Sequence, residues 1–174
     1  GRVRGKRVCV AVQVVPLRVE PGRGIAVLVG PADGRVRPPV VVEELADFGK
    51  ALFGKKRYLQ AASIFELGAA NTESKNYLDD AVYYGISVYY GNAGKPAESR
   101  DKAALANAEA TFDKILVASP TYDEAYIYKA RINSLLDKDD MIIKYYTEYV
   151  TKITAKGAEE LAKPATVKKI VESY

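Results

Sequence analysis

The chain has 174 residues with 26 basic and 22 acidic side chains, which gives a mild net charge of +4. It contains no His and one Cys, and this excludes a Ser-His-Asp triad, a Cys-His pair, a disulfide within the chain and a Cys/His zinc site. Carboxylate- or lysine-based catalysis stays open in principle, but we predict a protein that is not an enzyme and has no catalytic residue, metal site or cofactor.

Two parts with different compositions follow one another along the chain. The first 47 residues contain no aromatic side chain, whereas all thirteen Tyr and all four Phe come later. Residues 1–43 have a net charge of +5 and residues 44–174 a net charge of −1. We therefore predict a Val- and Arg-rich part over residues 1–40 and a separate domain over residues 41–174.

The predicted elements of the first part are short β-strands. Residues 7–14 alternate strictly, and a period of two with β-branched residues on one face is typical of a strand. The side chains on that face are Val8, Val10, Val12 and Val14. A second apolar run covers residues 24–30, and residues 35–37 are a candidate third strand. The pattern predicts a β arm or hairpin that is too small to form a core alone.

Three roles stay open for this arm. It packs on the helical part or is a leader foreign to the gene; it pairs with another chain, which would make the four valines an assembly arm; or its arginines bind anions. Nucleic acid is disfavoured as a partner, because no aromatic residue interleaves with the basic ones for base stacking.

The sequence predicts no membrane span, because no apolar run approaches the roughly 18 residues that a spanning helix needs. A secretory signal is also missing from the sequence. We therefore expect a cytoplasmic protein or, if a signal peptide has been removed, a periplasmic or extracellular one.

From residue 41 onward the apolar period becomes helical, and the same pair of helices recurs three times. In each pair the first helix carries a small residue at one repeated position. The second helix carries a second repeated position, which is followed four residues later by an aromatic residue. These residues are Gly49, Ala61 and Phe65 in the first pair, Gly85, Ala108 and Phe112 in the second, and Ala130, Ile142 and Tyr146 in the third. The second pair has eleven extra residues, which fit the Gly/Pro/Ser-rich segment 91–100 as a loop.

This pattern resembles the tetratricopeptide repeat (TPR) family, of the bacterial type, whose unit of about 34 residues places small residues where its two helices touch. The resemblance covers about residues 42–155, with departures at Glu73, where proline is usual, and at Ile142, in a small-residue slot. It implies a mainly α fold, a right-handed helical solenoid of three helix-turn-helix units with a C-terminal helix. The implied units cover residues 42–75, 78–120 and 123–156, with a partial fourth over 157–174.

TPR proteins usually hold their ligands in a concave groove lined by fixed positions of the first helix of each unit. Carried to this chain, those positions imply a partner-binding site of Lys50, Phe53, Tyr83, Ile86, Tyr89, Tyr90, Tyr128 and Arg131. The family's carboxylate clamp is not matched, because Ile86 and Tyr83 stand where the clamp has Asn. The groove instead suits an extended peptide or a partner helix, although packing between helices is the alternative role for each tyrosine.

Two functions follow from the resemblance and from the arm. The first is a non-catalytic scaffold that binds a protein or peptide in its concave groove. The alternative is a structural subunit that assembles head-to-tail into a homo-oligomer, a ring or a filament, through the β arm and the terminal helices.

Overall fold

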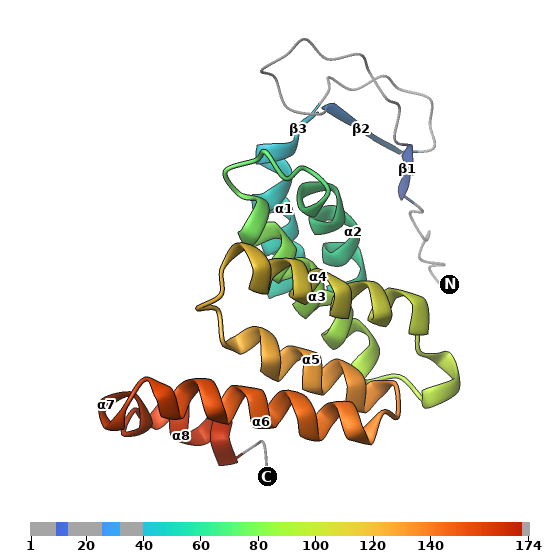
Figure 1. Ribbon diagram of the computed structural model, residues 1–174. Coiled ribbons are helices and arrows are strands. Elements are labelled where there is room, and N and C mark those ends of the chain that lie inside the picture. The colour runs from blue at the N-terminus through green and yellow to red at the C-terminus, as the bar shows by residue number, and fades with distance from the viewer. Residues whose placement is uncertain (1–9, 14–25, 32–39, 172–174) are drawn as a thin grey trace.

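The structure, a computed structural model, describes residues 10–13, 26–31 and 40–171, with the side chains of residues 45–171. It is mainly helical, as the sequence predicts (Figure 1). The helices are α1 (Val42–Gly54), α2 (Tyr58–Ala69), α3 (Tyr77–Ala93), α4 (Lys102–Ala118), α5 (Glu124–Leu135), α6 (Asp139–Ala155), α7 (Ala158–Leu161) and α8 (Pro164–Val171), with a 3-10 turn, η1 (Ala97–Ser99), before α4.

Three short strands precede the helices. β1 (Val10–Gln13) pairs antiparallel with β2 (Ala26–Pro31), which pairs antiparallel with β3 (Val40–Val41). β3 runs directly into α1, so the strand we considered over residues 35–37 is not the third strand described; that segment lies outside the described residues. Most of the predicted arm lies there too, and the arm as a whole stays a prediction.

Consecutive helices pack against one another in the order of the chain. α1 packs on α2, α3 on α4, and α5 on α6, while contacts of α2 with α3 and of α4 with α5 join each pair to the next. Figure 1 shows the pairs following one another from α1 toward α6 and α8. The predicted units over residues 42–75 and 123–156 each hold one such pair, and α3 begins one residue before the predicted unit over residues 78–120. Membership of a repeat family stays a prediction.

Two glycines let the helices of a pair approach closely. A Cβ on Gly49 of α1 would lie 2.8 Å from the ring of Phe65 on α2, and a Cβ on Gly85 of α3 would lie 2.5 Å from the ring of Phe112 on α4. No side chain fits at such distances in a close-packed interior. The same contact therefore occurs in both pairs, although eleven more residues separate the second glycine from its phenylalanine.

Each of these phenylalanines also joins its pair to the next. Phe65 stacks on Tyr83 of α3 with ring centroids 4.9 Å apart, and Phe112 stacks on Tyr128 of α5 at 5.6 Å. Offset stacking of this kind adds about 0.5–1.5 kcal/mol to the free energy gained by burial alone. Two successive junctions are thus built from the same contact.

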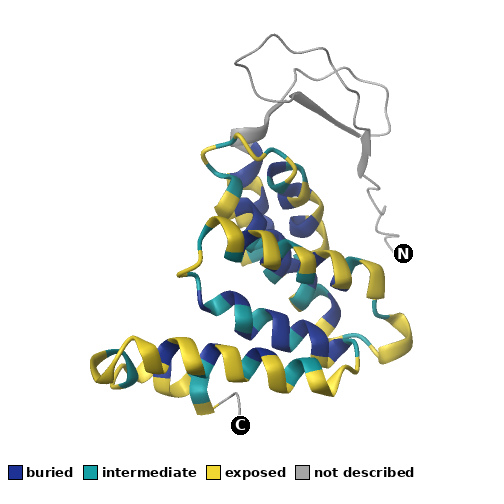
Figure 2. Cartoon of the chain, in the orientation of Figure 1, coloured by how far each residue is buried: buried dark blue, intermediate teal, exposed yellow. Residues whose placement is uncertain are grey.

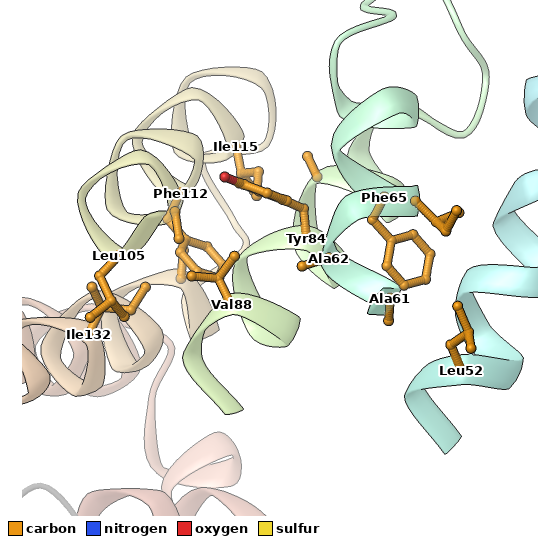
Figure 3. Close-up of a cluster of buried hydrophobic side chains, with 14 of the residues drawn as sticks. Leu52, Ala61, Ala62, Phe65, Tyr84, Val88, Leu105, Phe112, Ile115 and Ile132 are labelled. Carbon is orange, nitrogen blue, oxygen red and sulfur yellow. The ribbon is translucent and has the colours of Figure 1, made fainter. Parts of the chain in front are cut away.

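A continuous apolar core runs from α1 to α5. Phe65, Leu105, Phe112 and Ile115 are at most 1% exposed, and Figure 3 shows side chains from successive helices meeting there. The buried faces of the helices turn toward their neighbours, and the exposed faces turn outward (Figure 2). This core fixes the relative positions of α1, α3 and α5, which carry all eight predicted groove residues.

The inserted segment of the second pair is held in place by polar contacts. Oδ1 of the buried Asn92 accepts a hydrogen bond from the backbone N–H of Asp101 at 2.9 Å. Arg100 donates to the carbonyl oxygen of Leu135, at the end of α5, at 3.0 Å. The loop therefore ties the second pair to the third.

The start of this loop differs from the prediction. We placed it at residue 91, but residues 91–93 belong to α3, and the loop follows them. The reason is packing against α2, because a Cβ on Gly91 would lie 2.5 Å from the side chain of Leu59. A glycine that reads as a turn residue in sequence is here a contact point between two helices.

The last two helices cover one side of the third pair. Leu161 of α7 and Ile170 of α8 pack against a small cluster formed by Ile127, Tyr149 and Ile153 of α5 and α6. Lys169 of α8 also forms an ion pair with Glu124 of α5. The helix that we expected in the C-terminal tail therefore lies against the pair that precedes it.

Candidate functional site

A groove of about 770 Å³ lies among five helices, from α1 to α5. Its walls are mainly apolar, and half of the lining residues are aromatic. The lining residues are Phe53, Tyr58, Leu78, Asp79, Val82, Tyr83, Ile86, Tyr90, Ile115, Ser119, Tyr122 and Tyr128. A hollow of this size and character is the usual form of a binding site.

Helix α3 forms the floor of the groove. Leu78, Val82, Ile86 and Tyr90 follow one another at intervals of four residues, which places them along one stripe of the helix. The opposite side of α3 carries Tyr84 and Val88, which are buried in the core. Burial of one stripe in the core therefore holds the other stripe along the groove.

Aromatic rings pack against one another at one end of the groove. Phe53 meets Tyr58, Tyr83 and Tyr90 edge to face, with centroids 5.2, 5.5 and 6.2 Å apart. Tyr58 and Tyr90 stack at 5.2 Å. These contacts join α1, α2 and α3, so this wall exists before any ligand arrives.

Tyrosines with desolvated hydroxyl groups form the other end. Burial, together with the nearby hydroxyl of Tyr90, raises the pKa of Tyr128 to about 12. Burial also raises the pKa of Tyr122, as do Glu124, Tyr128 and Asp79. The hydroxyl groups of Tyr122 and Tyr128 therefore stay protonated and neutral at physiological pH, and a protonated hydroxyl can donate a hydrogen bond.

The charges around the groove neutralise one another. Asp79 is the one charged residue of the lining, and its carboxylate lies 2.6 Å from Nζ of Lys50. The hydrogen bond to Asp79 raises the pKa of Lys50, and the same ammonium group lies 5.4 Å from the centre of the Tyr83 ring. Glu124 is paired with Lys169. The ion pair of Lys50 and Asp79 therefore leaves the lining without an unbalanced charge.

The eight predicted groove residues gather in one place. Phe53, Tyr83, Ile86, Tyr90 and Tyr128 line the groove itself. The other three touch the lining from outside: Lys50 through Asp79 and Tyr83, Tyr89 through Tyr90 and Tyr128, and Arg131 over the ring of Tyr128. Their proximity is a fact of the structure, whereas their binding role stays a prediction.

Seven lining residues are not among the eight predicted ones: Asp79 and Val82 stand at family groove positions, and the other five do not. Tyr58, Leu78, Ile115, Ser119 and Tyr122 lie outside the family positions that the resemblance carries over. The Ser119-Pro120 sequence is the signal that could have located Ser119 and Tyr122. It ends α4 and places the following turn beside the start of α5.

Several other tyrosines have a structural role. Tyr84, Tyr145 and Tyr149 are at most 6% exposed and belong to the core or its edge. Their hydroxyl-bearing rings fill space between helices, which is the alternative that the sequence left open for the tyrosines.

The predicted assembly arm is described only in part. Val10 and Val12 lie in β1, whose backbone pairs with β2, but nothing is described of their side chains. Val8 and Val14 lie outside the described residues. The role of these four valines stays a prediction.

Two features are absent from the part of the chain that the structure describes. No group of three His, Cys, Asp or Glu side chains within them is placed to hold a metal ion. None of their helices combines the length and the apolar character that crossing a membrane requires.

Comparisons with known proteins identify no relative. No protein-family model matches the chain, and a search of curated proteins found no similar sequence. The groove and the packing of the helices are therefore the observations that bear on function.

Proposed function

We propose that the chain is a non-catalytic scaffold of the TPR type, a right-handed helical solenoid that binds a protein or peptide segment in the groove along α3. The observation that carries this proposal is the groove itself, which is lined by helices of all three pairs and is largely apolar. A surface hollow that is apolar and preformed is an expected docking site for a partner's side chains.

The packing of the helices supports the assignment to a repeat. The contact of a glycine with a phenylalanine inside a pair, and the stacking of that phenylalanine on a tyrosine of the next pair, both occur twice. Repeat proteins are built in this way, because each unit contacts its neighbours through the same surfaces.

Selection from a phage-displayed library of random peptides on the full chain tests the proposal. We expect a selected peptide to bind at least tenfold more weakly to Ile86→Arg, because Ile86 lies on the groove floor. The matched control is Ile143→Arg, which makes the same change at a residue of α6 that is 67% exposed and outside the groove lining. A binder that tolerates Ile86→Arg, or a library that yields none, contradicts the proposal; circular dichroism confirms that both variants fold.

Self-assembly is the second candidate, and one observation favours it. β1 is an edge strand of the three-stranded order β1-β2-β3, so the outer side of its backbone pairs with no residue that the structure describes. An edge strand is a template for strand addition by a second copy. We expect concentration-dependent oligomers in analytical ultracentrifugation of the full chain and their loss in Val12→Pro; a monomer at every concentration contradicts this candidate.

A further inference from the structure

Asp80 of α3 is a buried carboxylate that belongs neither to the groove lining nor to the apolar core. The residue is 2% exposed, and its Oδ1 atom has no hydrogen-bond partner in the part of the chain that the structure describes. Its Oδ2 atom lies only 2.2 Å from the position that a Cβ on Gly68 of α2 would take. A buried carboxylate without a partner costs much more free energy when it is charged than when it carries a proton.

The surroundings of Asp80 do not supply a counterion of its own. Among the described residues, two charged groups act on it: Asp79, its neighbour on α3, and Lys50 of α1. Nζ of Lys50 lies 2.6 Å from the carboxylate of Asp79, so its charge is already balanced. From α2, Gly68 faces Asp80 and carries no side chain. Burial, together with the charge of Asp79, therefore raises the pKa of Asp80 to about 6, against the opposing effect of Lys50.

Asp80 lies at the junction between the first helix pair and the later helices. The pair of α1 and α2 contacts those helices chiefly through α3. Aromatic side chains cross the same junction, because Phe53 of α1 and Tyr58 of α2 meet Tyr90 of α3 in the groove wall, with centroids 6.2 and 5.2 Å apart. This wall of the groove therefore keeps its shape only while the junction is closed.

Loss of the proton from Asp80 favours any state in which its side chain reaches water. In an opened junction the pKa of Asp80 returns toward its ordinary value of 3.8. The closed junction holds the proton more tightly, so a rise in pH toward and through 6 shifts the equilibrium toward the opened form. The two pKa values make the opened form roughly tenfold more populated at pH 7.5 than at pH 5.

We propose that the junction between α2 and α3 is a proton-sensitive hinge that controls the shape of the groove. With a proton on Asp80, the first helix pair stays closed on α3 and the aromatic wall is assembled. When the proton is lost, the pair opens more readily, and Phe53 and Tyr58 separate from Tyr90. The hinge acts in the unliganded chain, so it does not depend on what the groove binds.

Hydrogen exchange of the full chain without a ligand, measured by mass spectrometry from pH 5 to pH 7.5, tests the hinge. After correction for the intrinsic effect of pH on exchange, the protection of α1 and α2 should fall roughly tenfold, while that of α7 and α8 at the other end stays constant. Asp80→Asn should abolish the fall, because an amide of the same shape does not titrate. Asp140→Asn, at an exposed position of α6, is the matched control and should keep it.

Two further variants show whether charge sets the hinge. Lys50→Met removes the charge that lowers the pKa of Asp80, so protection should go on falling to a higher pH. Asp79→Asn removes the charge that raises this pKa, so the fall should end at a lower pH. A purely structural effect of either change would not move these end points in opposite directions.

Three results would overturn the hinge. An equal fall in α7 and α8 would show that the whole molecule unfolds. Constant protection of α1 and α2 at every pH would show that the junction stays closed when Asp80 ionises. A fall that survives in Asp80→Asn would show that another group is responsible. Since no ligand is present, none of these results decides the proposed function, which is tested separately by Ile86→Arg.

Discussion

Asp80 is a carboxylate that folding places in the interface between α2 and α3. Its side chain lies against Gly68 of α2, its residue is 2% exposed, and its Oδ1 atom has no hydrogen-bond partner among the described residues. Burial raises its pKa from 3.8 to about 6; the charge of Asp79 adds to the rise, and Lys50 opposes it. The interface accommodates this side chain because the residue opposite is a glycine.

The raised pKa predicts a dependence of stability on pH. The folded state holds a proton on Asp80 that the unfolded state has already lost, so the free energy of unfolding falls as the pH rises from about 4 through 6. Asp80→Asn removes this effect and keeps the shape. Relative to the unchanged chain, the variant should gain up to about 3 kcal/mol between pH 4 and pH 7.5. Urea unfolding at several pH values measures this gain.

Asp140→Asn controls for the loss of a carboxylate as such, because Asp140 is exposed on α6. Its effect on the free energy of unfolding should be small. An Asp80→Asn effect that is the same at every pH would show that Asp80 ionises in the folded chain as it does in the unfolded one.

Gly85 gives a second prediction at the scale of single residues. Gly85→Ala would place a Cβ 2.5 Å from the ring of Phe112, and that ring has no room to move because it is fully buried and stacks on Tyr128. Overpacking should outweigh the better helix propensity of Ala and lower the stability by about 1–2 kcal/mol.

Gly94→Ala is the matched control for Gly85→Ala. Nothing lies within 4 Å of the Cβ that it adds, and its φ of −87° suits alanine. Thermal unfolding should show a change of no more than about 0.5 kcal/mol. Equal stability of the two variants would contradict the prediction. It would mean that the ring of Phe112 shifts to make room for the added Cβ.

Helices α4, α5 and α6 meet through a polar contact as well as through the apolar core. Oε1 of Glu109 on α4 accepts hydrogen bonds from Nδ2 of Asn133 on α5 and from the hydroxyl of Tyr145 on α6, each at 2.8 Å. Tyr145 has a raised pKa because of burial and because of this bond to Glu109. One carboxylate thus ties three elements together.

Removal of one of the two hydrogen bonds to Glu109 should weaken the packing of the three helices. Tyr145→Phe deletes a hydrogen bond to a charged group, which predicts a loss of about 1.5–3 kcal/mol in urea unfolding. Tyr146→Phe, one residue along α6, is the control and should change stability by less than about 0.5 kcal/mol. A loss no larger than the control's would indicate that water replaces the hydroxyl.

The helices could be predicted from the sequence because their apolar period is strong and because the small residues Gly49 and Gly85 mark where helices touch. The lengths of α3 and of the loop after it could not, because Gly91 has the same appearance in sequence whether it ends a helix or contacts Leu59. The groove was predicted from positions on the first helix of each pair. Residues such as Ile115 and Tyr122 were missed because their place depends on how one pair packs on the next.

The molecule as a whole raises the question of whether its helix pairs form a linear array or one cooperative body. In a linear array each pair contacts only its neighbours, so damage at one end stays local. Ile170 of α8 is suited to a test, since it packs against the cluster of Ile127, Tyr149 and Ile153 at one end of the molecule. Ile170→Asp would bury a charge in that cluster and should detach α8.

Hydrogen exchange measured by mass spectrometry distinguishes the two cases in the full chain. For an array, Ile170→Asp should speed exchange in α7, α8 and the adjoining part of α6, while α1 and α2 keep their rates. Val171→Asp is the control, because Val171 is 69% exposed on the same helix. Faster exchange in every helix would show a single cooperative unit, and the solenoid that we propose would then be the wrong description of this chain.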